Sequence, residues 1–162
     1  MTLEAELLTL DQLPGWRAAF RATGGRLVVT NGCFDILHTG HVQYLVTGRS
    51  QGDALLVGVN GDASVRALKG EGRPLNSETD RARVLAALRT VDAVCIFPEP
   101  QATRFLGLAR PDVYVKGGDY TLETLNQDER RAVELGGGRI VIIPFLPGRS
   151  TTGLLEKIGR QQ

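Results

Sequence analysis

The chain has little cysteine or histidine, with two residues of each type in 162. Two cysteines, Cys33 and Cys95, exclude the disulfide framework of a small secreted scaffold. The 19 basic and 18 acidic residues nearly cancel, so the net charge of +1 offers no broad surface for nucleic acid or membrane lipid. The sequence also has no apolar run of about 20 residues, the length that spans a bilayer, and no signal-peptide pattern at its N-terminus. We therefore expect a cytoplasmic protein with no nucleic-acid or membrane partner.

Two common nucleotide-binding signatures are missing as well. The sequence contains neither a Walker P-loop nor a Gly-x-Gly-x-x-Gly turn, which argues against ordinary P-loop NTPases and dinucleotide oxidoreductases. The hydrophobic fraction of 42% is nevertheless enough for a substantial core. A length of 162 residues predicts a single domain, residues 1–162.

Five short apolar runs alternate with stretches of helical spacing. The runs are continuous rather than alternating in polarity, as expected for strands buried on both faces. They predict an α/β fold, a Rossmann-like, doubly wound, five-stranded parallel sheet with helices on both faces. Residues 1–24, which include Trp16 and Phe20, are expected to form a helical extension packed on this domain. The expected strands comprise residues 27–29, 54–59, 93–97, 113–115 and 140–143.

The most informative segment, residues 31–41, follows the first expected strand and contains both histidines of the chain. His38 and His41 would share one face of a first helical turn, beside free backbone N–H groups and the positive end of the helix dipole. Such a site favours a phosphate group. Imidazoles suit it because they donate directionally and can carry charge near neutral pH. The alternatives are structural histidines at a helix start and a zinc site with Cys33, which lacks a recognisable third ligand.

Basic and acidic residues also follow the other expected strands. Lys69 and Arg73 lie in a loop rich in glycine and proline, where they either hold phosphates or are solvated surface charges. Lys116 ends an apolar strand, and a buried strand has no obvious use for a lysine at that position. Asp119 is a candidate for a ribose hydroxyl or a metal-bound water, or for an ordinary turn. In parallel sheets the ligand lies at the carboxyl ends of the strands, so these positions are the expected ones.

The last expected helix begins near Ser150 and is preceded by Arg149. Three successive hydroxyl residues, Ser150, Thr151 and Thr152, exceed what one helix cap needs, and with Arg149 they fit a second anion site. Arg81 follows Asp80 at another helix start, where a surface ion pair is the simple alternative.

These residues resemble the signature of the cytidylyltransferase-like nucleotidyltransferase superfamily. The His-x-Gly-His core carries the resemblance, and shorter motifs follow in the same order: Lys69-Gly70, Asp80-Arg81, Val91-Asp92 and the segment from Ser150 to Thr152. Further segments resemble one subgroup, the adenylyltransferase domain of bacterial ADP-heptose synthase, over most of the chain from about Leu10 to Ile158. They are Gly58-Val59-Asn60, Leu68-Lys69-Gly70-x-x-Arg73-Pro74, Val115-Lys116-Gly117-Gly118-Asp119-Tyr120 and Ser150-Thr151-Thr152.

The resemblance implies transfer of AMP from ATP, with Mg²⁺, to a heptose 1-phosphate, and no metal ligands on the protein. It implies contacts with the triphosphate and the transition state for His38, His41 and Lys69. It implies nucleotide contacts for Asn31, Gly32, Cys33, Phe34, Gly40, Lys116, Asp119, Arg149, Ser150 and Thr151. It implies acceptor contacts for Asp35, Asn60, Arg73 and Arg81.

The resemblance also implies small-molecule substrates, a separate sugar kinase upstream in the pathway and a homodimer. Residues 121–131 differ from the Val- and Gly-rich stretch of the subgroup, which leaves the identity of the acceptor open. The alternatives are a cytidylyltransferase for a polyol phosphate, an FMN adenylyltransferase and a nucleotide-binding domain without turnover. A redox sensor at Cys33, near an expected helix N-terminus, is a further hypothesis.

Overall fold

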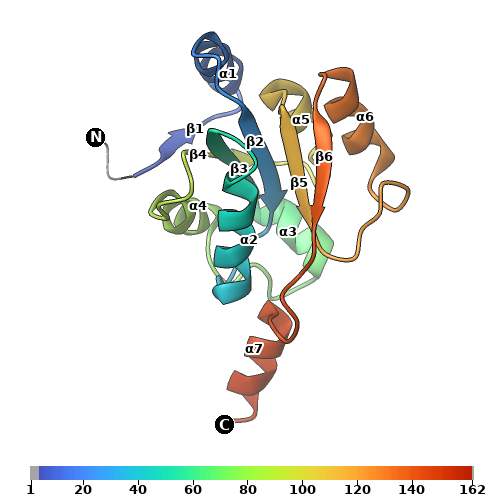
Figure 1. Ribbon diagram of the computed structural model, residues 1–162. Helices are drawn as coiled ribbons and strands as arrows, with labels where there is room; N and C mark the ends of the chain where they lie inside the picture. Colours follow the sequence, from blue (N-terminus) through green and yellow to red (C-terminus); the bar gives the residue numbers. More distant parts are fainter. Residues whose placement is uncertain (1–3, 162) are drawn as a thin grey trace.

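Parallel strands form the centre of the molecule (Figure 1). The computed structural model describes residues 4–161, and in this part of the chain six strands pair in the order β1-β4-β3-β2-β5-β6. All five expected strands are confirmed, since each expected range lies within an observed strand. The strands are β1 (Glu6–Leu8), β2 (Leu27–Gly32), β3 (Ala54–Asn60), β4 (Ala93–Phe97), β5 (Val113–Gly117) and β6 (Arg139–Ile143).

The described chain therefore has one strand more than the five expected, and the addition is β1. Residues 1–3 of the expected helical extension lie outside the described residues, and the remainder forms β1 and helix α1 (Leu13–Ala22). Glu6 pairs with Ala93 and Leu8 with Cys95, so β1 completes the edge beside β4. A strand of three residues has too short a pattern to distinguish it from a helical turn. Its conformation depends on backbone pairing with β4, which the local sequence does not encode.

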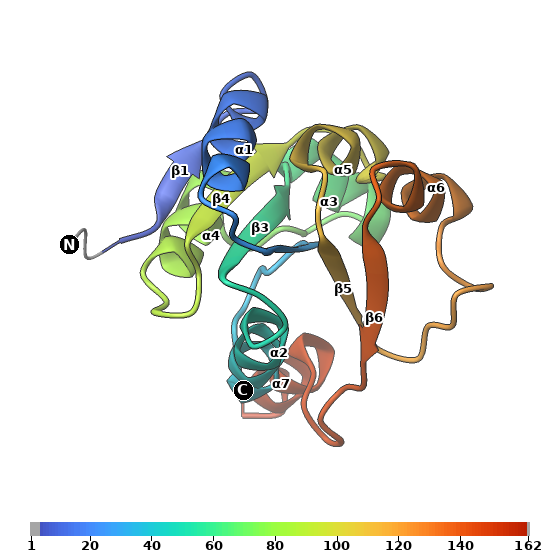
Figure 2. The same ribbon diagram turned by 45° about the horizontal axis from the view of Figure 1, so that its top comes forward.

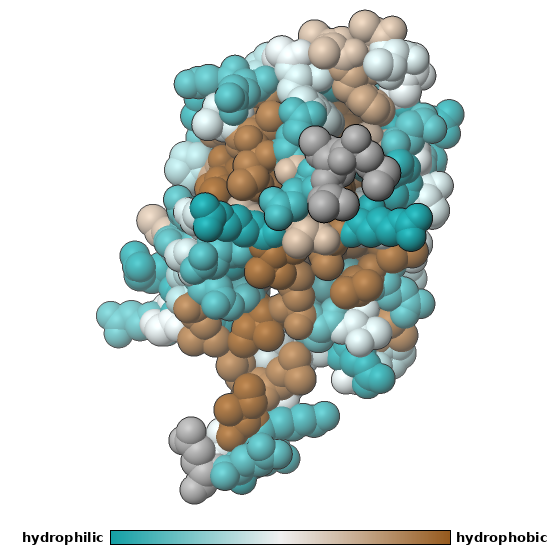
Figure 3. Space-filling view, turned by 90° about the vertical axis from the view of Figure 1, so that its left-hand side faces the viewer, coloured by the Kyte–Doolittle hydropathy of each residue, from teal (hydrophilic) through white to brown (hydrophobic). Residues whose placement is uncertain are grey.

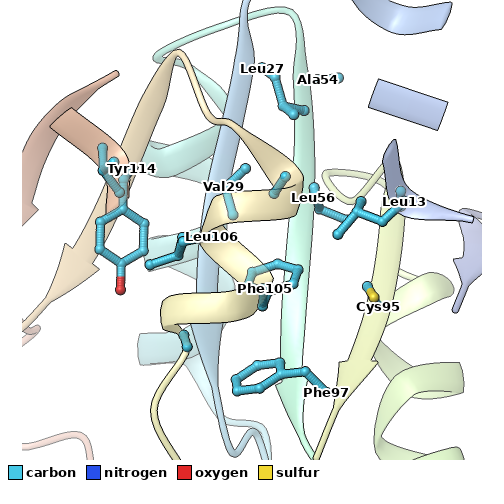
Figure 4. Close-up of a cluster of buried hydrophobic side chains, with 14 residues drawn as sticks. Leu13, Leu27, Val29, Ala54, Leu56, Cys95, Phe97, Phe105, Leu106 and Tyr114 are labelled. Atoms are coloured by element: carbon cyan, nitrogen blue, oxygen red, sulfur yellow. The ribbon is translucent and has the colours of Figure 1, made fainter. Parts of the chain in front are cut away.

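Helices cover both faces of the sheet, as expected (Figure 2). Leu27 and Val29 point to one face, where Phe105 of α5 packs in a cluster that also includes residues of α1 and α6 (Figure 4). Val28 points to the opposite face and packs in a cluster with Leu45 of α2 and residues of α4. This alternation follows from the two-residue period of a strand. The helices named here are α2 (Thr39–Arg49), α4 (Glu78–Ala86), α5 (Thr103–Ala109) and α6 (Gln127–Leu135).

Two further helices, α3 (Asp62–Lys69) and α7 (Thr151–Gly159), lie near the carboxyl ends of the strands. Helix α7 extends away from the sheet, and apolar residues are visible along it in the space-filling view (Figure 3). None of its residues, all of which belong to the described chain, is buried. No helix within residues 4–161 is long and apolar enough to cross a membrane.

The strand order has one reversal, and it lies between β2 and β5. From β2 the chain proceeds to β3 and β4 on one side, and it then returns to β5 on the other side of β2. Connections that leave in opposite directions open a crevice at the carboxyl ends of these two strands. The fold thus predicts where a ligand binds before any side chain is considered.

Candidate functional site

A cavity of about 850 Å³ lies at this point of reversal, at the carboxyl ends of β2 and β5. Its lining brings together segments that are more than 100 residues apart in the sequence, from the end of β2 to the start of α7. Most of the predicted site residues line it. They are Asn31, Gly32, Cys33, Phe34, Asp35, His38, Gly40, His41, Asn60, Lys69, Arg73, Lys116, Arg149, Ser150 and Thr151.

The two histidines cap helix α2 with one edge of each ring. Nδ1 of His38 accepts a hydrogen bond from the backbone N–H of Gly40 over 3.1 Å, and Nδ1 of His41 accepts one from the N–H of His38 over 3.3 Å. A neutral imidazole that accepts at Nδ1 carries its proton on Nε2. Both rings therefore have an N–H group left to donate, and their centroids are only 4.0 Å apart. Capping thus uses the Nδ1 edge of each ring and leaves the Nε2 edge available for a ligand.

Gly40 allows the histidines and Arg149 to meet over the start of α2. A Cβ atom at position 40 would lie 2.8 Å from Cε1 of His38 and 3.2 Å from Cβ of Arg149. The first distance is well inside van der Waals contact, so any side chain would displace the His38 ring. The glycine of the His-x-Gly-His motif is thus required by packing at the site.

Both histidines are neutral in the free protein at pH 7. Burial, together with the smaller effect of the neighbouring His38, lowers the pKa of His41 to about 4. Burial and the positive charge of Arg149 also lower the pKa of His38. Histidine can carry charge near neutral pH, but the lowered pKa values leave these two rings uncharged in the free site. Positive charge at the cavity is therefore supplied by Arg149 and Lys69.

The depressed pKa of His41 predicts a pH dependence of stability. Between pH 6.5 and about 4 the unfolded chain protonates His41 and the folded chain does not, so the free energy of unfolding should fall as pH decreases through this window. Chemical denaturation at closely spaced pH values measures it. The variant His41→Asn should show a flatter profile in the same window. Asp35 does not interfere, because its pKa is lowered from 3.8 and its contribution is lost only at more acidic pH.

The start of α7 is tied directly to the loop that precedes α2. The hydroxyl of Thr151 donates to the carbonyl oxygen of Ile36 over 3.1 Å, and Ser150 caps the helix by accepting from the N–H of Gly153. Cβ of Arg149 and the ring of His38 both lie close to Gly40, and the positive charge of Arg149 helps to lower the pKa of His38. The histidine pair and the hydroxyl-rich segment therefore line one cavity, so one anion can contact both.

Asp35 and Arg73 fasten a loop onto the site. Arg73 donates from Nε to the Asp35 carboxylate over 2.9 Å, and the N–H groups of Leu75 and Asn76 donate to the same carboxylate over 2.8 and 2.9 Å. Burial alone would raise the pKa of Asp35, but these hydrogen bonds outweigh it and the pKa is lowered. Lys69 lies at the end of α3, just before this loop, and its exposed side chain lines the cavity. We infer that Asp35 positions the loop, since its oxygens are already occupied.

Two of the predicted site residues lie outside the lining of the cavity. Arg81 is 1% exposed, and its guanidinium donates to the carbonyl oxygens of Cys33 and Asn76 and to Asp62. It therefore stabilises the backbone of the loop at Cys33. Asp119 is exposed and follows Gly118, whose φ of 115° turns the chain. The sequence motif places both residues near the site but does not show which way they point.

Asn60 and Cys33 line the cavity, but their surroundings indicate structural roles. The amide of Asn60 donates to Ser64 and to the carbonyl oxygens of Glu99 and Pro100, so it fixes the loop after β4. Burial raises the pKa of the Cys33 thiol, and nearby cations, Lys69 foremost, offset this only in part. A raised pKa is the opposite of what a reactive thiolate needs, which argues against the redox hypothesis.

The geometry agrees with a family assignment. The sequence profile of the cytidylyltransferase-like family matches residues 29–152, which include the histidine pair and the start of α7. The chain belongs to the cytidylyltransferase-like family. This confirms the resemblance seen in the motifs.

Relatives of this cytidylyltransferase-like chain match nearly all of it. The bifunctional protein HldE of Geobacter sulfurreducens is 50% identical over 155 residues, which is 96% of this chain. The bifunctional protein HldE of Alkalilimnicola ehrlichii is 51% identical over 152 residues, or 94% of this chain. The chain spans 31% of the length of each of these relatives.

Solved structures share the fold. The lipopolysaccharide core biosynthesis protein from Thermoplasma volcanium is 27% identical, with a TM-score of 0.61 over 76% of this chain and 98% of that chain. Pantoate-beta-alanine ligase from Francisella tularensis is 12% identical, with a TM-score of 0.62 over 92% of this chain and 69% of that chain. The second similarity concerns the fold alone.

The cytidylyltransferase-like site also includes residues that the sequence did not predict. Two of them lie beside Lys116, whose ammonium is 3.4 Å from the hydroxyl of Tyr114 and 3.8 Å from the carboxylate of Glu129. Glu129 lines the cavity, whereas Tyr114 is fully buried and contacts the site only through its hydroxyl. Tyr114 lies inside an apolar run, which indicated only core, and Glu129 lies in a charged helix, which indicated a solvated face. No local pattern distinguishes them. Further unpredicted lining residues are Gln43, Tyr44, Thr47, Gln101, Tyr120, Asn126 and Phe145.

Proposed function

We propose that this domain transfers AMP from ATP to heptose 1-phosphate, giving ADP-heptose and pyrophosphate. One observation carries the proposal: the N–H groups of His38 and His41 and the cationic Arg149 line a single cavity with the start of α7. Directional donors, a fixed positive charge and a helix N-terminus together fit a polyphosphate. The choice of acceptor is supported by the ADP-heptose synthase motifs and by the 50% identity to a bifunctional HldE protein.

The proposed reaction is an in-line displacement. A phosphate oxygen of the sugar phosphate attacks the α-phosphorus of ATP, the bond from that phosphorus to the bridging oxygen breaks, and pyrophosphate leaves with the electron pair. A phosphate monoester is largely ionised at neutral pH, so no general base is needed. The histidine N–H groups, Arg149 and Lys69 would stabilise the charge that develops on the phosphoryl oxygens and the leaving group. Catalysis then rests on alignment and electrostatics.

The two ends of the cavity differ in chemistry, which supports an orientation for the substrates. Successive residues of β5 point to opposite faces of the sheet. On the face of Gly117, the apolar residues 143–147 line the cavity, and the Phe145 ring would lie 3.1 Å from a Cβ at position 117. On the face of Lys116, the lining is polar: Glu129 lies 3.8 Å from the Lys116 ammonium, Asn126 caps the same helix, and Gln101 precedes Ala102, whose N–H donates to Glu129. We place the base of the nucleotide at the apolar end and the hydroxyl-rich acceptor at the polar end.

Magnesium would accompany the nucleotide. Within residues 4–161 no group of three or more histidine, cysteine, aspartate or glutamate side chains is placed to hold a metal ion. Mg²⁺ commonly binds through substrate phosphates and water, with few protein ligands. An ion held by the triphosphate would need no such group of protein ligands.

The remaining partners follow from the same proposal. The heptose phosphate must come from a kinase reaction. A second copy of the chain has apolar surface available on α2 and α7, where Val42, Val46 and Ile158 are exposed. Both cysteines are free thiols, which fits a reducing compartment such as the cytoplasm.

Pyrophosphate release tests the proposed function. The purified chain is incubated with ATP or CTP and with heptose 1-phosphate, glycerol 3-phosphate or FMN, and products are identified by mass spectrometry. We expect the highest kcat/KM with ATP and heptose 1-phosphate. Preference for CTP with a polyol phosphate, or for ATP with FMN, would replace this function by one of the two related transferases. Tight ATP binding without pyrophosphate release from any pair would indicate a non-catalytic domain.

A further inference from the structure

The carboxylate of Glu129 is buried at the polar end of the cavity. The residue is 6% exposed and belongs to the cavity lining, although it lies on helix α6. Its Oε1 accepts a hydrogen bond from the backbone N–H of Ala102 over 2.7 Å. Its Oε2 is 3.4 Å from the hydroxyl of Tyr114 and 3.8 Å from the ammonium of Lys116. The two oxygens thus have very different surroundings.

The described residues give Oε2 one hydrogen bond, a long one of 3.4 Å from the Tyr114 hydroxyl. Tyr114 has a single hydroxyl proton, and Oδ1 of Asn31, at 2.6 Å, competes for it at much shorter distance. Tyr114 stands at the side of this apolar cluster, and none of the labelled side chains lies beyond its hydroxyl (Figure 4). Lys116 provides opposite charge at 3.8 Å, which is beyond hydrogen-bond distance. A buried carboxylate oxygen without a close donor is costly, so a donor from a ligand would be strongly favoured there.

The chemistry of the ligand follows from the charge of Glu129. A carboxylate accepts hydrogen bonds and repels phosphates, so it selects a neutral hydroxyl group. The amides of Asn126 and Gln101 line the same end of the cavity and can serve further hydroxyl groups. A ribose and a sugar acceptor both carry such groups, and the apolar character of residues 143–147 at the opposite end favours the acceptor here.

We propose that Glu129 is a specificity-determining residue whose Oε2 accepts a hydrogen bond from a hydroxyl group of the sugar-phosphate acceptor. This inference rests on the proposed function. It adds that Glu129 distinguishes acceptors that carry this hydroxyl group from acceptors that lack it. Its structural alternative is that Glu129 only connects α6 to the start of α5 through Ala102.

The variant Glu129→Gln separates the two. Glutamine keeps an oxygen for the N–H of Ala102 and places an NH₂ group, a donor, where Oε2 was. We expect the KM for the acceptor to rise roughly 10- to 100-fold, as for a lost hydrogen bond to a charged group. The KM for ATP and the melting temperature should stay near those of the wild type. The matched control is Glu134→Gln, because Glu134 lies on the same helix and pairs only with Arg130 at the surface.

Acceptor analogues provide a second measurement that needs no variant. Sugar 1-phosphates that lack single hydroxyl groups are compared with the wild-type enzyme. One of them should lose about tenfold or more in kcat/KM, and Glu129→Gln should remove this discrimination. A rise in the KM for ATP instead would assign the oxygen to the ribose and overturn the proposal. Unchanged KM values with a lower melting temperature would leave only the structural role.

The proposed function can fail separately from this inference. The comparison uses whichever phosphate acceptor the wild-type chain turns over. Turnover of a different acceptor would contradict heptose 1-phosphate as the substrate, and the role of Glu129 could still be tested with that acceptor. If Glu129→Gln still discriminates between acceptors with and without the hydroxyl group, the proposed role of Glu129 is wrong and the proposed reaction is unaffected. A chain that turns over no acceptor overturns both.

Discussion

Replacing His41 with asparagine should lower kcat for pyrophosphate release by on the order of 10² or more, as expected when one transition-state donor is lost. Nδ1 of His41 caps α2 by accepting from the N–H of His38. The asparagine oxygen can take that place, because it reaches about as far from the backbone as Nδ1. The asparagine NH₂ group takes the place of Cδ2 and stops one bond short of Nε2, so the donor at the Nε2 position is lost. The substitution therefore removes the catalytic group and keeps the cap.

The measurement is kcat with saturating ATP and acceptor, together with the melting temperature of each variant. His41→Ala is the comparison, because it removes both the donor and the cap. We expect similar losses of kcat from the two variants, but a lower stability only for alanine, by about 1 kcal/mol for a lost cap. Near-normal turnover by a well-folded His41→Asn enzyme would show that His41 serves α2 alone.

The fold could be predicted from the sequence because its main signals are local. Strands buried on both faces are short, continuous apolar runs, and each of the five expected runs is a strand. The motif at residues 31–41 is local too, and the structure places it at the expected end of β2. Strand β1 could not be predicted, because its partner β4 is more than 80 residues away in the sequence.

The candidate site was predictable in its composition and less so in its geometry. Sequence patterns indicate residue types near a strand end, and they do not show burial. The tertiary structure makes His41 neutral by burying it, and it places the N–H groups of a loop against the Asp35 carboxylate. It also places Glu129, on a charged helix, in the cavity lining. Arg81 shows the same limit, since a charged residue at a helix start indicated the surface or the substrate and the structure buries it.

Replacing Arg81 with methionine should lower the free energy of unfolding of the domain by about 3 kcal/mol. This is the low end of the range expected when one partner of a buried ion pair is removed. The guanidinium has no exposed surface, and the Asp62 side chain it contacts is 36% exposed, so water can compensate part of the loss at Asp62. The carbonyl oxygens of Cys33 and Asn76 would each lose their guanidinium donor as well. For a domain of this size the loss corresponds to roughly 6–12 °C in melting temperature.

Arg83→Met is the matched control, because Arg83 lies on the same helix and is exposed. Its melting temperature should be close to that of the wild type.

The two possible roles of Arg81 make opposite predictions. If Arg81 bound the acceptor, its loss would raise the KM for the acceptor and leave the denaturation midpoint unchanged. If it braces the loop, the midpoint falls, and the KM values measured well below the melting temperature stay near those of the wild type. We expect the second result, because the Arg81 guanidinium is fully enclosed by protein and Cys33, whose carbonyl oxygen it holds, lines the cavity.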